Sequence, residues 1–187
     1  MASDTSSIAS DSSSIHHEYM RECIKLSLNA PAKPTNFRVG ALLVAEPSHT
    51  ILATGYTLEL PGNTHAEQSA LAKYAQQKGV DDPEHRLADA FPPPPPGSTD
   101  TKLAIYTSME PCALRLSGNK TCAQRILDTR AQGWGVTKVY YGLKEPETFV
   151  GESAGVKMLT DAGIELEYVA GLEEEILTVT LAGHAHK

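Results

Sequence analysis

Residues 109–122 read MEPCALRLSGNKTC and place Cys112 and Cys122 on either side of a nine-residue loop. A His-Ala-Glu triplet precedes them at residues 65–67. Zinc prefers nitrogen and sulfur ligands, and a catalytic zinc site keeps three protein ligands with water in the fourth position. One histidine and two cysteines satisfy that requirement. We therefore predict that His65, Cys112 and Cys122 hold one catalytic Zn²⁺ per chain.

Glu67 lies two residues after His65, in the expected first turn of the same helix. Zinc lowers the pKa of its bound water to roughly 7, and a nearby carboxylate can then carry protons. The pattern H-x-E followed by P-C-x-x-C is typical of zinc deaminases of nucleobase-like rings, in which the glutamate is the acid/base and not a ligand. We predict that Glu67 is the catalytic residue. The chain departs from this pattern in one respect, because nine residues separate its two cysteines instead of two.

A different interpretation of these residues is a core histidine beside two unrelated buried cysteines, or a closed structural zinc site. A closed site would need a fourth ligand. The remaining cysteine, Cys23, lies on the apolar face of an expected helix. Such a cysteine is better explained as a small core side chain. The catalytic interpretation is therefore favoured.

Helical and strand-like segments alternate around these motifs. Helices are expected at residues 15–29, 63–78, 121–132, 156–162 and 173–181, and strands at residues 39–45, 51–56, 103–107, 136–142 and 164–169. Such alternation is typical of an α/β fold with helices on both faces of a sheet. We expect a three-layer α/β/α fold around a mixed five-stranded sheet.

The length of 187 residues is sufficient for one ordinary domain, which we place at residues 15–187. Residues 1–14 are rich in Ser, Asp and Ala and are expected to form a disordered tail. Residues 79–101 carry Pro83 and five consecutive prolines at 92–96. Proline is excluded from helix and central-strand interiors. We therefore expect a proline-rich surface insertion that acts as a spacer.

The formal net charge of −7 argues against a nucleic-acid partner, because such proteins usually present a basic surface. No apolar run of 18 residues or more occurs, so no membrane span is expected. Residues 1–14 lack the pattern of a secretory signal and contain no arginine. We expect a cytoplasmic protein, in which disulfides are disfavoured.

The motifs at residues 65–67 and 109–112 resemble those of the cytidine-deaminase-like superfamily. The long inter-cysteine loop is similar to that of the riboflavin-biosynthesis pyrimidine deaminases. Further similarity to that group, and to its fungal members, lies in the stretches NFRVG (36–40), RLSGN (115–119), EPETFV (145–150) and AGI (162–164). The resemblance covers roughly residues 15–172 and is interrupted by the proline-rich insertion.

This resemblance implies a stand-alone enzyme that deaminates 2,5-diamino-6-ribitylamino-4(3H)-pyrimidinone 5'-phosphate to 5-amino-6-ribitylamino-uracil 5'-phosphate and ammonia. It also implies a homodimer. The residues expected to contact this small phosphorylated pyrimidine are Asn36, Ala66, Glu110, Arg115, Ser117, Lys120 and Lys144. Basic side chains of the inter-cysteine loop would attract the phosphate. Arg125 and Arg130, on the following helix, are expected to form a solvated face.

Three other functions remain open at this point. A deaminase of free cytidine or deoxycytidylate would use the same zinc chemistry, but it usually has the short C-x-x-C spacing. A polynucleotide deaminase would need a basic approach surface, which the net charge disfavours. A non-catalytic zinc-binding subunit would be expected to lack Glu67. The sequence does not distinguish a ribityl from a ribosyl substrate.

Overall fold

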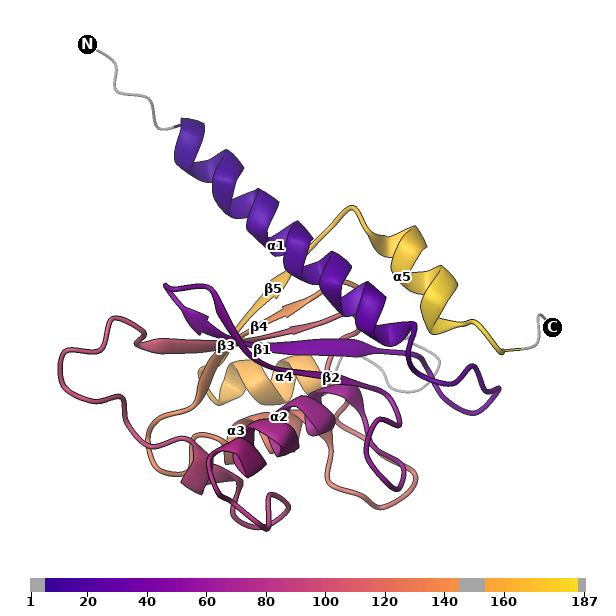
Figure 1. Cartoon of the computed structure of the whole chain (residues 1–187). Helices are drawn as coiled ribbons and strands as arrows, with labels where there is room; N and C mark the ends of the chain where they lie inside the picture. The colour runs from indigo at the N-terminus through magenta and orange to yellow at the C-terminus, as the bar shows by residue number, and fades with distance from the viewer. Residues whose placement is uncertain (1–5, 145–153, 185–187) are drawn as a thin grey trace.

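The computed structural model describes residues 6–144 and 154–184. Five strands form one mixed sheet with helices on both faces, which confirms the predicted three-layer α/β fold (Figure 1). In chain order the elements are α1 (Ser6–Ser27), β1 (Gly40–Glu46), β2 (Thr50–Tyr56), α2 (Ala66–Gln77), the 3₁₀ helix η1 (Leu87–Ala90), β3 (Lys102–Thr107), α3 (Cys122–Asp128), β4 (Val136–Tyr141), α4 (Ala154–Asp161), β5 (Glu165–Tyr168) and α5 (Glu173–Thr180).

The sheet has the strand order β2-β1-β3-β4-β5. Strand β1 is antiparallel to β2 and β3, whereas β3, β4 and β5 run parallel. The pairing of Ala41 with Thr107 brings the start of β1 to the end of β3. The loop before β1 and the loops after β3 and β4 therefore meet at one edge. In open α/β sheets, ligands bind at the carboxyl ends of the parallel strands.

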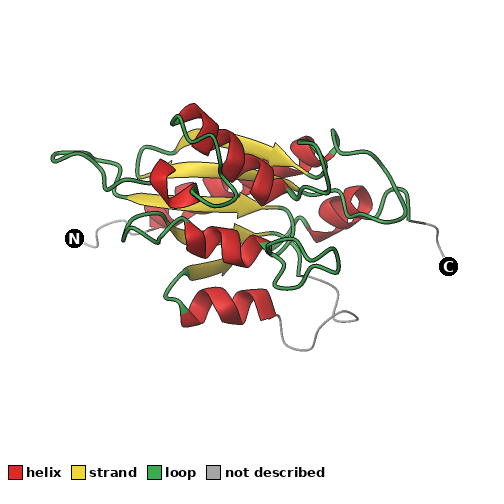
Figure 2. Cartoon of the chain, turned by 90° about the horizontal axis from the view of Figure 1, so that it is seen from below, coloured by secondary structure: helices red, strands yellow, loops and turns green. Residues whose placement is uncertain are grey.

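The two faces of the sheet bury separate clusters of apolar side chains. Successive residues of a strand point to opposite faces, so Leu42 and Leu43 of β1 enter different clusters. Helices α1 and α5 cover one face, and Cys23 lies fully buried there, as expected for a core side chain (Figure 1). Helices α2, α3 and α4 cover the other face, and Figure 2 views the molecule from their side.

Helix α1 begins at Ser6, nine residues earlier than expected. Residues 6–14, predicted as part of a disordered tail, are therefore helical. The physical reason is that adding residues to an existing helix requires no new nucleus, so even a polar segment can extend it. These first turns project beyond the sheet (Figure 1). None of the helices within the described ranges combines the length and the apolar character needed to cross a bilayer.

The insertion at residues 79–101 does more than join two core elements, and its description as a surface spacer is incomplete. Val80, Leu87, Ala90 and Phe91 are buried in the cluster beneath α2. The ring of Phe91 packs 5.1 Å from that of Tyr74. The apolar residues that precede the proline run thus complete the core, whereas the prolines themselves lie at the surface.

Candidate metal centre and active-site pocket

Three separate segments place the predicted zinc ligands at the end of the sheet where the parallel strands β3 and β4 terminate. His65 is the residue that caps the N-terminus of α2, and its backbone is extended (φ −91°, ψ 164°). Cys112 lies in the segment that follows β3, and Cys122 is the first residue of α3. Their ligand atoms all lie within 4.8 Å of one another, and both cysteines are buried. The fold therefore gathers three potential ligands that are up to 57 residues apart in sequence.

The distances between the ligand atoms fit a tetrahedral zinc site. Nδ1 of His65 lies 3.5 Å from Sγ of Cys112 and 3.3 Å from Sγ of Cys122. Zinc bonds of about 2.3 Å to sulfur and 2.0–2.1 Å to nitrogen, at tetrahedral angles, separate such atoms by about 3.6 Å. Three ligands leave the fourth position for water, as in catalytic zinc sites. The residues present therefore fit the ion.

The two thiols form a coupled pair that favours the anionic form of Cys112. The pKa of Cys112 lies well below its usual range because of its interaction with the Cys122 side chain, with a further contribution from His65. The same interaction, together with burial, raises the pKa of Cys122. The backbone N–H of Cys122 also lies 3.5 Å from the Cys112 sulfur. Thiolates are the form in which cysteine binds a metal.

Glu67 lies in the first turn of α2 beside the ligand atoms and is 3% exposed. One carboxylate oxygen accepts a hydrogen bond from Cys122 Sγ at 3.3 Å, and the other lies 3.2 Å from the Thr107 hydroxyl. Burial raises the pKa of the Glu67 carboxyl, and the charge of Cys112 adds to the rise. A buried carboxylate with a raised pKa is suited to accept and return a proton at neutral pH.

A cavity of about 150 Å³ opens beside the metal centre. It is lined by Thr35, Asn36, Phe37, Val39, Thr57, Asn63, His65, Glu67, Met109, Glu110 and Cys112. Two of the predicted substrate-contacting residues, Asn36 and Glu110, are among them. The Asn36 amide nitrogen donates to the Pro31 carbonyl at 3.3 Å, whereas its buried Oδ1 has no hydrogen-bond partner in the described residues. That oxygen can accept a hydrogen bond from a ligand.

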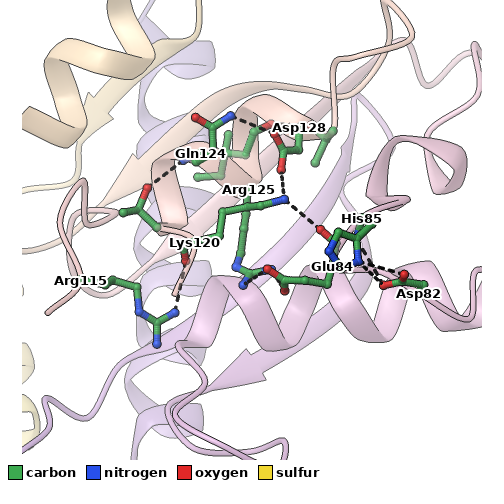
Figure 3. Close-up of polar contacts among 11 residues, drawn as sticks. Asp82, Glu84, His85, Arg115, Lys120, Gln124, Arg125 and Asp128 are labelled. Atoms are coloured by element: carbon green, nitrogen blue, oxygen red, sulfur yellow. Dashed lines mark hydrogen bonds and ion pairs between the residues drawn. The ribbon is translucent and has the colours of Figure 1, made fainter. Parts of the chain in front are cut away.

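The other predicted contact residues are not among those that line the cavity. Ala66 is fully buried within α2, and Ser117 and Lys144 are exposed. The Lys120 ammonium contacts Asp128 at 2.7 Å and the Glu84 carbonyl at 2.8 Å (Figure 3). The side chain of Arg115 is also engaged, with acceptors on neighbouring segments.

Arg125 was expected on a solvated helix face, and that expectation is wrong. Its side chain is 5% exposed and forms an ion pair with Glu84 of the insertion (Figure 3). The reason is that the insertion folds over α3 and covers this face. Arg130 lies two residues beyond the end of α3, is partly buried and donates to the Ala162 carbonyl at 3.1 Å.

The sequence did not reveal which residue packs against Phe37, an aromatic side chain that lines the cavity. The ring of Phe37 stacks on His184 near the C-terminus, with centroids 5.1 Å apart and an interplanar angle of 5°. His184 Nε2 also lies 3.0 Å from the Asn36 carbonyl oxygen. Phe37 stood inside a recognised motif, but His184 offered no signal, because 148 residues separate it from Asn36. The motif at residues 145–150 lies outside the described residues.

The cytidine and deoxycytidylate deaminase zinc-binding region matches residues 13–142 of the chain. The chain belongs to this family. The match includes His65, Glu67, Cys112 and Cys122, the residues that the structure gathers at the candidate metal centre. Membership of this zinc-binding deaminase family confirms the predicted superfamily and identifies the chain as an enzyme with a zinc cofactor.

Relatives of this deaminase agree with the narrower resemblance. The Schizosaccharomyces pombe diaminohydroxyphosphoribosylamino-pyrimidine deaminase is 30% identical over 172 residues, which are 92% of this chain and 36% of that protein. The chain thus spans about a third of the length of that curated relative.

Solved structures of deaminases show the same fold. The Aspergillus oryzae Rib2 deaminase in complex with DARIPP, a C-terminal deletion mutant, is 49% identical, with a TM-score of 0.79. The alignment covers 91% of this chain and 92% of that one. The Thermotoga maritima deaminase/reductase is 23% identical, with a TM-score of 0.64 over 90% of this chain and 40% of that one, and it supports the fold alone.

Proposed function

We propose that this deaminase hydrolyses 2,5-diamino-6-ribitylamino-4(3H)-pyrimidinone 5'-phosphate in riboflavin biosynthesis. The observation that carries the proposal is the cavity, which Glu67 and two of the predicted metal ligands, His65 and Cys112, line together with Asn36 and Glu110. The 49% identity to the A. oryzae enzyme, which was solved with DARIPP, supports this choice of substrate. The product is 5-amino-6-ribitylamino-uracil 5'-phosphate, and the leaving group is ammonia.

Zinc and Glu67 have different roles in the proposed reaction. When bound by His65, Cys112 and Cys122, zinc supplies an acidified water. Glu67 would accept a proton on a carboxylate oxygen and deliver it to the ring nitrogen next to C2. A second proton transfer through Glu67 allows the C2 amino group to leave as ammonia. The oxygen of the water becomes the new carbonyl oxygen at C2, so the atoms balance.

The size and the polar groups of the cavity favour one planar ring. A volume of about 150 Å³ lies below the roughly 300–1,000 Å³ of pockets that enclose drug-sized ligands. The ring enters, and the phosphorylated side chain lies towards the opening. Oδ1 of Asn36 accepts a hydrogen bond from the ring edge, and the buried Glu110 carboxylate faces the same space.

The phosphate then contacts residues at the rim, and we propose Lys144 for this role. Lys144 is exposed and follows Leu143, whose carbonyl accepts the Glu110 backbone N–H at 2.9 Å. The position places a cation next to a residue that lines the cavity. Ser117, exposed in the inter-cysteine loop, is a second proposed rim contact.

We also propose that the enzyme acts in the cytoplasm, as a homodimer. The compartment is supported by the potential metal site that Cys112 and Cys122 form with His65, which needs both thiols outside a disulfide. Cysteines in reducing compartments remain available for metal binding. The homodimer is supported by family resemblance, and sedimentation of the purified enzyme tests it.

The experiment that tests the proposed function is an ammonia-release assay with the diamino-ribitylamino-pyrimidinone phosphate. Cytidine, deoxycytidylate and guanine serve as competing substrates under the same conditions. The proposal predicts the highest kcat/KM for the phosphorylated pyrimidinone. A preference for cytidine or deoxycytidylate would establish the alternative nucleoside or nucleotide deaminase. No ammonia release with any of them, from zinc-loaded protein, would support a non-catalytic subunit.

A further inference from the structure

The inter-cysteine loop is long, yet both of its ends must be fixed at the candidate metal centre. It must hold Cys112 and Cys122 close to His65, although nine residues separate the cysteines. Zinc deaminases typically separate them by two. A longer flexible loop has more conformations to lose when its ends are fixed. The large apolar side chains of this loop do not anchor it, because Leu114 is 58% exposed and Leu116 is 92% exposed.

Arg115 is the side chain of this loop that is buried against the body of the enzyme, with an exposed fraction of 8%. Its guanidinium donates to the Asn63 carbonyl, to Gln68 Oε1 at 3.0 Å and to the Lys120 carbonyl at 3.4 Å. Figure 3 shows its contact with the backbone of Lys120. One side chain therefore bridges both ends of the loop and the start of α2.

The acceptors of Arg115 surround the histidine ligand. Asn63 lies two residues before His65, and Gln68 lies in the first turn of α2. Gln68 Oε1 also accepts the backbone N–H of His65 at 3.4 Å. The amide oxygen of Gln68 is thus shared between the histidine ligand and the arginine of the cysteine loop. Any displacement of the loop is transmitted to the backbone that carries His65.

We propose that Arg115 is a positioning residue for the metal centre, which sets the separation between the two cysteines and His65. The part of this proposal that concerns turnover rests on the proposed function, whereas the part that concerns zinc retention does not. Arg115 is not among the residues that line the cavity, so its role differs from the substrate contact that the sequence suggested. Outer contacts of this kind typically change metal affinity 10–100-fold when they are removed.

An arginine suits this role better than a lysine would. The planar guanidinium presents five donors in a fixed fork, so that it can serve three acceptors on different segments. A lysine ammonium at the same place is a flexible point charge. Arg115→Lys therefore keeps the charge and loses the geometry. Failure of this variant to restore zinc retention separates positioning from a purely electrostatic effect.

The test measures zinc release and turnover in the same variants. Purified full-length enzyme is loaded with zinc and mixed with a chromogenic chelator, and the release rate is followed. Arg115→Met is expected to release zinc about 10–100-fold faster than the wild type. With saturating zinc, kcat for the pyrimidinone phosphate falls while KM stays unchanged. A residue that binds substrate would instead raise KM and leave zinc release unaffected.

Arg125→Met is the matched control, because it also removes a buried guanidinium from this region. Arg125 pairs with Glu84 of the insertion, and among the described residues its side-chain hydrogen bonds go to Glu84 and not to the segment that carries His65, so zinc release is expected to stay near the wild-type rate. If Arg115→Met does not fold, Gln68→Leu removes the shared acceptor and should also accelerate release. Release from Arg115→Met no faster than from Arg125→Met would overturn the proposal. If the wild type does not turn over the pyrimidinone phosphate but Arg115→Met still releases zinc faster than Arg125→Met, only the proposed function is overturned.

Discussion

Arg125 and Glu84 form a two-pronged ion pair, with Nη1 2.6 Å from Oε2 and Nη2 3.0 Å from Oε1. The arginine comes from α3 and is buried, whereas the glutamate comes from the insertion and is 43% exposed. The Lys120 ammonium contacts the Glu84 backbone carbonyl at 2.8 Å as well. The insertion is therefore fastened to the helix that begins with Cys122.

Removing the charge of Glu84 should destabilise the enzyme. Glu84→Gln leaves the Arg125 guanidinium buried without its counter-charge, and breaking a fully buried pair typically costs 3–5 kcal/mol. Because Glu84 is partly exposed, water can reach the arginine, and we expect about 1–3 kcal/mol. Urea denaturation measures the loss. The double variant Glu84→Met/Arg125→Met should be more stable than Glu84→Gln, and a further loss would contradict this account.

Replacing Glu67 should separate metal binding from turnover. Glu67→Gln keeps the size of the side chain but removes its ability to accept a proton, and such groups contribute about 10²–10⁴-fold to rate. We expect zinc content to remain at one ion per chain while the rate of ammonia release falls by at least about 10²-fold. Elemental analysis and the ammonia assay measure the two quantities. Substantial activity in the zinc-loaded variant would contradict the role of Glu67.

The three cysteines should differ in their effect on zinc content. Cys112→Ser and Cys122→Ser each remove a ligand, so the purified variants should retain little zinc and show no turnover. Cys23→Ala should retain zinc, because Cys23 is buried in the core on the opposite face of the sheet. In the wild type, chelation should abolish activity, and added zinc should restore it. Loss of zinc from Cys23→Ala alone would contradict the ligand assignment.

Gly55 allows α2 to approach the sheet closely. A Cβ atom at this position would lie 2.2 Å from the Ala66 carbonyl oxygen and 2.5 Å from the Ala70 nitrogen. Both are backbone atoms of the helix that carries Glu67, so Gly55→Ala must push the helix outward. We expect a loss of about 1–3 kcal/mol, typical of overpacking, with faster zinc release. Thr54→Ala on the other face of β2 is the control and should stay within about 0.5 kcal/mol of the wild type.

Acid sensitivity of the fold should depend partly on His16. Its ring stacks on Tyr140, with centroids 4.4 Å apart, and Nδ1 lies 2.8 Å from the Tyr106 hydroxyl. Burial lowers the pKa of His16 below its usual value of 6.5, although the negative charges of Glu167 and Glu46 oppose this. The unfolded chain therefore binds more protons than the folded one just below pH 6.5. Linkage requires this contribution to stability to be complete above that pH and to be lost as the pH falls.

The corresponding measurement is the melting temperature of variants between pH 7.5 and pH 5. His16→Gln should show a smaller loss on acidification than the wild type, even if its stability at pH 7.5 is lower. Tyr106→Phe removes the hydroxyl partner but retains the histidine, so its pH dependence should persist. Identical pH dependence in His16→Gln and wild type would assign the acid sensitivity to other groups.

The sequence by itself determined the residues of the metal centre and the order of the elements. His65, Glu67, Cys112 and Cys122 could be found because zinc chemistry requires those residue types in a recognisable pattern. The strands and most helices followed from local hydrophobic periodicity, which depends only on neighbours in the chain. Their ends were less certain, as the early start of α1 at Ser6 shows.

Only the tertiary structure decided which polar side chains face the cavity and which hold the fold together. The sequence predicts that Arg115 and Lys120 contact the substrate, whereas in the structure Arg115 donates to Asn63, Gln68 and Lys120, and Lys120 to Glu84 and Asp128. The ring of Phe37 stacks on that of His184, which is 147 residues away in the sequence. Arg125 pairs with Glu84, which is 41 residues away. The hydrogen-bond partners of such a side chain are the acceptors that folding brings close to it. Those acceptors come from distant segments of the chain, so a local sequence pattern cannot predict them.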